Sequence, residues 1–392
     1  MRRISIALGL ALAGCNGGGT PVETEGGATA ATSTGDMSTG TGSSGQASTD
    51  MPGGTSAETT EAGPTTVAEP TTGGSTGAPD LPPPKPPGLT VYVTGEPGDA
   101  DVVPAGPGLI LMGGSTDVDA AFMWQKGLIA GGDVVVLRAS GADGYNEYLY
   151  TEIGGVDSVE TMIVDTKALA EDPYVAWTIA HAEAVFLAGG NQAVYMTAWK
   201  DTPVEGALME VWARGGVIGG TSAGLAVLGE FIYAAYNDSV IEDEALLDPY
   251  NMYMTMEREF LALPPLATVV TDSHFTARRR LCRLIGFVAR IVADGWGTEV
   301  LGIGVDEQTA LVVGPDGIGE VLGAGAVHLL HSNGPPQQCV AGQPLEYAEL
   351  DWYQLAAGDT VALPAGVPQG VAATKLSASG GALSPAYDCK EN

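Results

Sequence analysis

The stretch Gly220-Thr221-Ser222-Ala223-Gly224 places a serine between small residues. It follows the β-branched pair Val217-Ile218 and precedes an apolar segment with helical spacing. This order predicts a strand, a sharp turn and a helix, with Ser222 at the apex of a turn that only small neighbours allow. A hydroxyl held there is suited to act as a nucleophile. In a second interpretation the serine only caps the helix, and the pattern alone does not separate the two.

A serine nucleophile needs a base within hydrogen-bond reach and a third group that orients the base. His274 is the best candidate for the base, because it follows the predicted strand 268–271 and would begin a helix at the same sheet edge as Ser222. Glu307 or Asp306, at the end of a later predicted strand, would orient it.

Chain order offers a competing assignment, which is the α/β-hydrolase sequence of serine, acid and histidine. It would use Ser222, Asp272 and either His328 or His331. A protein that only binds ligands on an inert fold is the third alternative.

Four arginines lie between residues 278 and 283: Arg278, Arg279, Arg280 and Arg283. Arg278 follows His274 by one helical turn, where a guanidinium is suited to hold a substrate carboxylate with two hydrogen bonds. If a helix begins near residue 273, Arg280 lies at the margin of its apolar face and Arg283 points away. In so acidic a protein, the cluster would alternatively only pair with neighbouring carboxylates.

These residues need a scaffold, and short apolar runs, several of them followed by glycines, supply its pattern. Such strands are predicted at 108–112, 134–138, 162–164, 184–188 and 217–219, with a helix at about 118–130. Strands that alternate with helices predict a doubly wound, mainly parallel α/β sheet whose strands are buried on both faces. Alternating runs beyond residue 309 predict a β-rich C-terminal extension.

The N-terminal 88 residues are of a different kind. Residues 1–15 have a basic start, an apolar run and Leu12-Ala13-Gly14-Cys15, which predicts an export signal and a lipid on Cys15. Asn16 after the cysteine is typical of lipoproteins sent to the outer membrane. Residues 16–88 are rich in Gly, Ser, Thr and Pro, which predicts a disordered tether. We expect one domain, 89–392, held at the cell envelope.

The net charge and the cysteines indicate which partners and which covalent links to expect. The formal net charge of −31 makes nucleic acid an improbable partner. Export favours a disulfide, and we predict it between Cys339 and Cys389, which lie in loop-like sequence, since Cys282 lies in a predicted helix. No spacing of histidines, cysteines or acids predicts a metal site.

Four motifs occur in the order of a known family: Gly189-Gly190-Asn191-Gln192, Gly220-Thr221-Ser222-Ala223-Gly224, Asp272-Ser273-His274-Phe275 with its arginines, and Gly302-Ile303-Gly304-Val305-Asp306-Glu307. Together they resemble cyanophycinase and its dipeptidase E relatives, which are serine peptidases on a flavodoxin-like, glutamine-amidotransferase-type fold. The resemblance runs from about Gly108 to about Gly366.

The resemblance implies Ser222 as nucleophile, His274 as general base and Glu307 as its acidic partner. It also implies an oxyanion site at the N–H groups of Gly190 and Ala223. Substrate-binding residues would be Gln192, Asp272, Arg278, Arg280 and Arg283. No cofactor is expected.

The implied substrates are peptides or isopeptides with aspartyl and arginyl groups, including fragments of cyanophycin. Ser273 stands where cyanophycinases usually have Gln, so the substrate is less firmly implied than the reaction. Asp272 and the segment Glu242-Asp243-Glu244 are candidates to receive a cationic group. We leave a homodimer open.

Overall fold

A computed structural model describes residues 81–389 of the chain, apart from the side chain of Glu242. The predicted signal with Cys15, and the predicted tether up to residue 80, lie outside the described residues. Residues 81–389 fall within one compact unit. No helix in this range is both long enough and apolar enough to cross a membrane.

The first sheet has five parallel strands at its centre. In spatial order they are β4 (Ser158–Ile163), β3 (Val134–Arg138), β5 (Ala184–Leu187), β6 (Val217–Thr221) and β2 (Gly108–Met112). Antiparallel strands complete both edges, with β1 (Thr90–Gly95) beside β4, and β11 (Thr309–Val313), β12 (Ile318–Gly323) and β15 (Thr360–Ala362) beyond β2.

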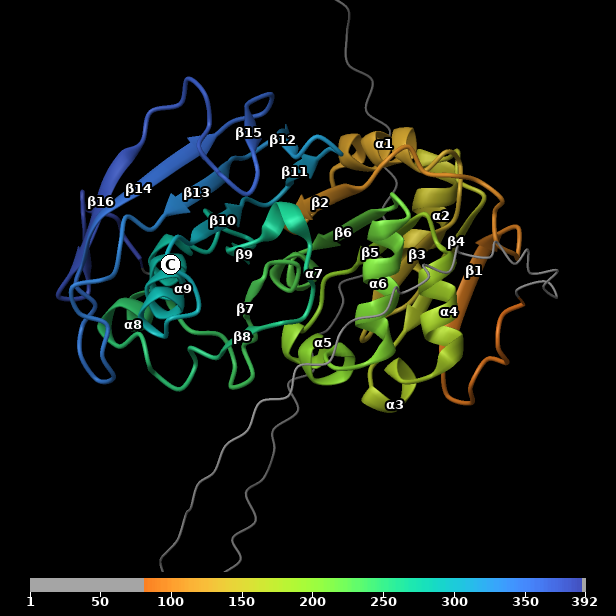
Figure 1. Ribbon diagram of the computed structural model, residues 1–392, viewed down its shortest axis with the longest axis horizontal. Coiled ribbons are helices and arrows are strands. Elements are labelled where there is room, and N and C mark those ends of the chain that lie inside the picture. The colour runs from red at the N-terminus through yellow and green to blue at the C-terminus, as the bar shows by residue number, and fades with distance from the viewer. Residues whose placement is uncertain (1–80, 390–392) are drawn as a thin grey trace, which may run out of the picture. The chain divides into compact units, whose positions relative to one another are not determined.

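Helices cover both faces of this sheet, which confirms the predicted doubly wound arrangement (Figure 1). On one face, α4 (Pro173–His181), α5 (Gln192–Trp199) and α6 (Pro203–Ala213) belong to the same apolar core as Leu109 and Leu111 of β2. On the other, α1 (Asp119–Leu128) packs against Ile110 and Met112. Successive side chains of a strand point to opposite faces, so apolar residues at every position are buried in two separate cores.

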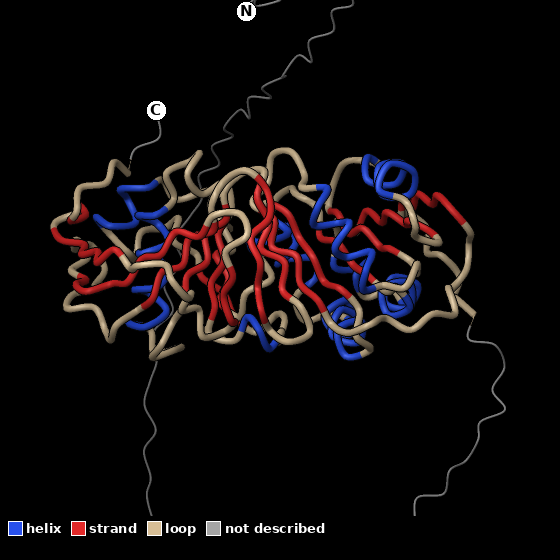
Figure 2. Tube along the Cα trace, turned by 90° about the horizontal axis from the view of Figure 1, so that it is seen from above, coloured by secondary structure: helices blue, strands red, loops and turns tan. Residues whose placement is uncertain are grey.

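A second sheet holds the elements that the sequence predicts as a continuation of the first. Its spatial order is β17 (Ala382–Ser384), β16 (Thr374–Ser379), β14 (Tyr347–Leu355), β13 (Val327–His331), β10 (Leu301–Val305), β9 (Val269–Asp272), β7 (Phe231–Tyr233) and β8 (Met256–Arg258). Only β7, β9 and β10 run parallel to one another. The long helix α9 (Leu281–Ala293) packs on this sheet, and strands of both sheets run between helices in Figure 2.

The remaining helices are short. They are α2 (Gly144–Glu147), the π-helix η1 (Tyr148–Ile153), α3 (Lys167–Ala170), α7 (Ala223–Ala226), α8 (Glu242–Leu247) and the 3₁₀-helix η2 (Pro264–Leu266).

The two sheets meet at the turn between β10 and β11. Only residues 306–308 separate these strands, and Gln308 has a left-handed backbone with φ 55°. The turn sends β11 back to pair with β2, whereas β10 stays paired with β9 and β13. Carboxyl ends of strands from both sheets therefore come together at this junction.

The predicted disulfide is wrong. Cys389 bonds to Cys282, with their Cα atoms 5.8 Å apart, and Cys339 is a free thiol. Cys282 lies in α9 on the buried side that the C-terminal segment covers, and Arg279 and Asp388 form an ion pair beside the disulfide. A cysteine within a helix can therefore form the disulfide, because Cys282 faces the segment that carries Cys389.

Candidate active site

Ser222 lies at the turn between β6 and α7, as the sequence predicts. Its backbone has φ 54° and ψ −115°, a conformation that non-glycine residues rarely adopt and that costs about 1–3 kcal/mol. Packing requires glycine two positions after Ser222, because a Cβ at Gly224 would lie 2.0 Å from the carbonyl oxygen of Leu187. The strain at Ser222 is thus held in place by close contact between the turn and β5.

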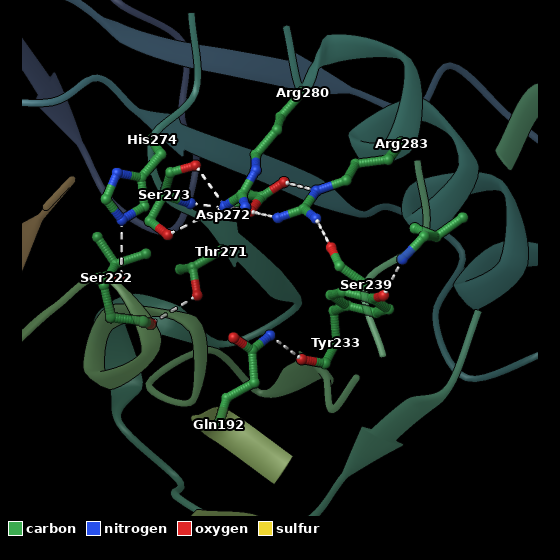
Figure 3. Close-up of polar contacts among 12 residues, drawn as sticks. Gln192, Ser222, Tyr233, Ser239, Thr271, Asp272, Ser273, His274, Arg280 and Arg283 are labelled. Carbon is green, nitrogen blue, oxygen red and sulfur yellow. Dashed lines mark hydrogen bonds and ion pairs between the residues drawn. The ribbon is translucent and has the colours of Figure 1, made fainter. Parts of the chain in front are cut away.

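Three side chains form a hydrogen-bonded chain at the junction of the sheets. The Oγ atom of Ser222 lies 2.8 Å from Nε2 of His274, and Nδ1 of His274 lies 2.7 Å from Oε1 of Glu307. Figure 3 shows the first of these contacts. Ser222 directly follows β6, His274 lies two residues after the end of β9, and Glu307 lies two residues after the end of β10.

The loop after β2 fixes the imidazole. The N–H of His274 donates to the carbonyl of Gly113 over 2.8 Å, and His274 itself has a left-handed φ of 46°. A Cβ at Gly114, where φ is 100°, would lie 2.5 Å from Cε1 of the ring. Only glycine at position 114 allows the ring to lie against this loop.

The surroundings of His274 favour the neutral imidazole. Burial lowers its pKa, the hydrogen bond to Glu307 raises it, and the positive charges of Arg278 and Arg280 lower it; the pKa lies below the ordinary 6.5. A neutral ring that donates from Nδ1 to Glu307 has a bare Nε2 facing Ser222. This is the form that accepts a proton from a serine hydroxyl.

The turn after β5 lies beside the serine. A Cβ at Gly189 would be 3.5 Å from Cβ of Ser222, and the Tyr195 hydroxyl secures the turn by donating to the carbonyl of Ala188 over 2.8 Å. The N–H groups of Gly190 and Ala223 have no acceptor among residues 81–389. Two backbone donors next to a serine are what an oxyanion requires.

A cavity of about 530 Å³ opens from Ser222 and His274. Its wall includes Gln192, Arg278, Arg280 and Arg283, four of the five residues that the resemblance implies for substrate binding, together with Ser273. The side-chain N–H of Gln192 is already used, since it donates to the carbonyl of Tyr233 over 2.7 Å.

Asp272 does not line the cavity, which corrects its predicted role in substrate contact. It is 2% exposed and accepts hydrogen bonds from Nε and Nη2 of Arg283 over 2.7 and 2.5 Å, while Nη1 of Arg280 lies 3.4 Å away (Figure 3). Burial alone would raise its pKa, but the two arginines hold the pKa of Asp272 below its ordinary value. Asp272 positions the guanidinium groups and is not available to a cationic ligand.

Arg283 faces the cavity, so its predicted position on the far side of a helix is wrong. α9 begins at Leu281, after the turns of residues 275–280, and every residue from Leu281 to Ala289 is buried. The face of α9 that carries Arg283 therefore lies against the cavity wall and not against solvent. Nη1 of Arg283 donates to Oγ of Ser239 over 2.9 Å.

Arg278 is the most available cation of the cluster. Its side chain is exposed, lines the cavity, and forms no hydrogen bond or ion pair with another group within residues 81–389. Its backbone N–H donates to the carbonyl of His274 over 3.0 Å, which keeps it on the histidine side of the site.

Ser273 is directed to Arg280. The Ser273 carbonyl accepts from Nη1 of Arg280 over 2.9 Å, its Oγ lies 3.4 Å from the same atom, and the residue is 3% exposed. The residue therefore supports an arginine and reaches little of the cavity.

Sequence reasoning missed the segment that closes the cavity, residues 233–239. This segment contributes Tyr233, Ala235, Tyr236, Asp238 and Ser239 to the wall, whereas Asp243 and Glu244 do not line the cavity. No motif marks these residues, and only the turn-forming Asn237-Asp238-Ser239 could have suggested a loop here.

The competing histidines lie elsewhere. His328 is 5% exposed, with Nε2 3.3 Å from Oδ1 of Asp306, and His331 directs Nε2 to the carbonyl of Gly366 over 2.7 Å. Neither bonds to Ser222. Within the described residues, no three or more His, Cys, Asp or Glu side chains are arranged to hold a metal ion.

Known proteins resemble the central part of this chain. The sequence model of Peptidase family S51 matches residues 143–319, a range that contains Ser222, His274 and Glu307. Cyanophycinase of Geminocystis herdmanii is 30% identical over 216 residues, which are 55% of this chain and 69% of that protein. The chain belongs to peptidase family S51.

Other members of the S51 family align over shorter ranges. Cyanophycinase of Trichormus variabilis is 32% identical over 213 residues, covering 52% of this chain and 65% of that protein. Cyanophycinase of Synechococcus elongatus is 31% identical over 177 residues, covering 45% of this chain and 50% of that protein. The chain therefore spans about half the length of this relative. A crystal structure of a peptidase from an acI-B1 Actinobacterium superposes with a TM-score of 0.44 at 20% identity, over 66% of this chain and 97% of that one.

Proposed function

We propose that this chain is a serine peptidase that hydrolyses peptide or isopeptide bonds next to an aspartyl residue. Ser222 is the nucleophile, His274 the general base and Glu307 the group that orients the base. The observation that carries the proposal is the Ser222–His274–Glu307 hydrogen-bonded chain at the mouth of an arginine-lined cavity.

The proposed reaction begins when Oγ of Ser222 attacks the scissile carbonyl carbon and Nε2 of His274 takes the hydroxyl proton. The carbonyl oxygen becomes negatively charged, and the N–H groups of Gly190 and Ala223 donate to it; losing one such donor typically lowers the rate about 100-fold or more. The C–N bond then breaks, and His274 returns the proton to the leaving amine. Water, deprotonated by the same imidazole, attacks the acyl-enzyme and releases Ser222.

Glu307 acts through the imidazole. By accepting a hydrogen bond from Nδ1–H, the carboxylate selects the tautomer whose Nε2 faces the serine, and it stabilises the imidazolium that forms during the attack. A serine at a strained turn, a neutral histidine and a carboxylate in this order are suited to acyl transfer.

The charges of the cavity support an anionic substrate group. Arg278 is exposed and without a partner among residues 81–389, and a guanidinium binds a carboxylate with two hydrogen bonds. Relatives named cyanophycinase lead us to propose small aspartyl or β-aspartyl peptides, including cyanophycin-derived ones. Ser273 offers less contact than the Gln of relatives, so we propose that long cyanophycin chains are hydrolysed less well; one lost hydrogen bond in a buried site costs about 1–3 kcal/mol.

Labelling with a serine-directed phosphonate tests the nucleophile. We expect one label, on Ser222, which disappears in Ser222→Ala and becomes at least about 100-fold slower in His274→Ala. His331→Ala is the matched control, since this histidine bonds to the carbonyl of Gly366 away from the serine. An esterase of the α/β-hydrolase type would instead lose labelling with His328→Ala or His331→Ala and keep it with His274→Ala, and a protein that only binds ligands would not be labelled.

A further inference from the structure

We propose that Asp238 forms a cation-binding subsite at the end of the cavity remote from Ser222, and that it makes the enzyme prefer substrates with a positively charged group. The inference rests on the proposed peptidase function and adds a residue that selects the substrate. It also replaces Asp272 and the segment 242–244, the acids that the sequence suggested for this role.

Among the described residues that line the cavity, Asp238 is the one carboxylate. The other nearby acid, Asp272, is 2% exposed and occupied by Arg283 and Arg280. Within this described part of the chain, a cationic ligand group that enters the cavity therefore meets the carboxylate of Asp238. The residue is exposed, so its charge is available to a ligand.

The loop that carries Asp238 is fixed at both ends. At one end, the side chain of Gln192 donates to the carbonyl of Tyr233 over 2.7 Å. At the other, Arg283 donates to Oγ of Ser239 over 2.9 Å, and the N–H of Val240 donates to the Tyr233 hydroxyl over 2.6 Å. These bonds hold the carboxylate in place before a ligand arrives, which reduces the entropy lost on binding.

One oxygen of Asp238 remains for a ligand. Oδ1 accepts from the N–H of Ser239 over 2.8 Å, which orients the carboxylate, and Oδ2 bonds to no group within residues 81–389. The backbone at Asp238 has a left-handed φ of 83°, a conformation that Asp tolerates better than most residues. An oriented carboxylate with one unused oxygen is suited to bind an ammonium or guanidinium group.

The position of the loop separates this subsite from the anion site. In Figure 3, Ser239 and Tyr233 lie on the opposite side of the arginine cluster from Ser222 and His274. Arg278 stays on the histidine side through its N–H bond to the His274 carbonyl. A substrate with an anionic group near the scissile bond and a cationic group further away would bind the first to Arg278 and the second to Asp238.

Matched substrates test the subsite. Aspartyl and β-aspartyl peptides of arginine are compared with the same peptides of citrulline, which has nearly the same shape without the charge. Asp238→Asn should lower kcat/KM for the arginine peptides about 10-fold, equal to about 1.4 kcal/mol and within the range for a hydrogen bond to a charged group, and leave the citrulline peptides unchanged. Asp316→Asn is the control, because Asp316 is also an exposed turn residue that accepts a neighbouring N–H but lies outside the cavity.

A third set of substrates identifies the source of the positive charge. If Asp238 binds the free α-amine instead of a basic side chain, N-acetylation of the citrulline peptide will lower kcat/KM of wild type about 10-fold, and Asp238→Asn will remove the difference. An equal effect of Asp238→Asn on the arginine peptides and on the N-acetylated citrulline peptides, which carry no positive group, or no effect on any substrate, overturns the inference while the peptidase proposal stands.

Binding without turnover keeps the two proposals distinguishable. In the Ser222→Ala protein, we expect arginine amide to bind more tightly than citrulline amide by calorimetry, and Asp238→Asn to abolish the preference. If wild type hydrolyses none of the peptides, the proposed function fails, and this measurement still decides for or against the cation subsite.

Discussion

Asp306 and Glu307 are adjacent in the chain, yet their carboxylates bond to different histidines. Glu307 accepts from His274 over 2.7 Å, whereas Oδ1 of Asp306 lies 3.3 Å from Nε2 of His328. Asp306 also accepts the N–H groups of Thr276 and Ala326 over 2.8 and 3.0 Å. One acid is directed to the proposed general base, and the other joins the turns around it.

Replacing Asp306 by Asn should loosen the turn that presents Glu307. We expect kcat to fall by about 10-fold or more with KM nearly unchanged, because small displacements of catalytic groups are costly whereas the cavity wall is untouched. Steady-state kinetics on an aspartyl peptide measures the split. A rise in KM at constant kcat would contradict this positioning role.

The same residue predicts a pH dependence of stability. Burial tends to raise the pKa of Asp306, but the hydrogen bond from His328, its charge and two backbone donors lower the pKa to about 2. A carboxyl whose pKa is lowered on folding stabilises the protein above its unfolded value of about 3.9, here by about 2 kcal/mol, and loses this as the pH falls toward 2. Denaturant unfolding of wild type and Asp306→Asn should differ at pH 6 and converge near pH 2.

The pH profile of activity should reflect the lowered pKa of His274. A base works only when neutral, so the acid limb of kcat/KM should have its midpoint below 6.5. Glu307→Gln removes an interaction that raises this pKa, so the midpoint should move to still lower pH while kcat falls by as much as about 10⁴-fold. A shift to higher pH in Glu307→Gln would be inconsistent with this geometry.

Arg278 and Arg283 should respond differently to truncation. Arg278→Ala removes an exposed cation, so we expect kcat/KM for aspartyl peptides to fall about 10-fold or more with little change in the free energy of unfolding. Arg283→Ala leaves Asp272 buried without its main partner, which typically costs about 3–5 kcal/mol. Thermal or denaturant unfolding, measured together with steady-state kinetics, separates the effect on stability from the effect on catalysis. Equal destabilisation by both variants would contradict the different roles of Arg278 and Arg283.

The disulfide gives a third stability test. Cys282→Ser or Cys389→Ser opens a link across 107 residues, and we expect a loss of about 2–5 kcal/mol in unfolding free energy. Cys339→Ser should have little effect, since that thiol is free. Peptide mapping without reductant should recover residues 282 and 389 together.

Attachment to the cell envelope is tested through Cys15, which lies outside the described residues. We expect the full chain to partition with membranes and Cys15→Ser to appear in the soluble fraction, because a lipid on this thiol would be the anchor. Unchanged membrane association of the variant would exclude Cys15 as the anchor.

Local sequence was sufficient for features that depend on neighbours in the chain. The turn at Ser222 follows from the order of β-branched, glycine and small residues, and the parallel strands from their apolar runs. His274 and Glu307 could be proposed because residues at carboxyl ends of strands tend to share one edge. Glu307 could not be preferred over Asp306 from the residues alone, since two adjacent side chains at the end of a strand are equivalent until the turn that follows is known.

Tertiary structure decided what depends on contacts between distant segments. Because α9 is buried on all sides around Arg283, the face that carries this arginine meets the cavity and not solvent, and burial against two arginines removed Asp272 from the substrate site. Cys282 pairs with Cys389 because the C-terminal segment returns to α9, and no local pattern records that return. Asp238 entered the cavity wall for the same reason: Gln192 and Arg283, from two other parts of the chain, hold its loop there.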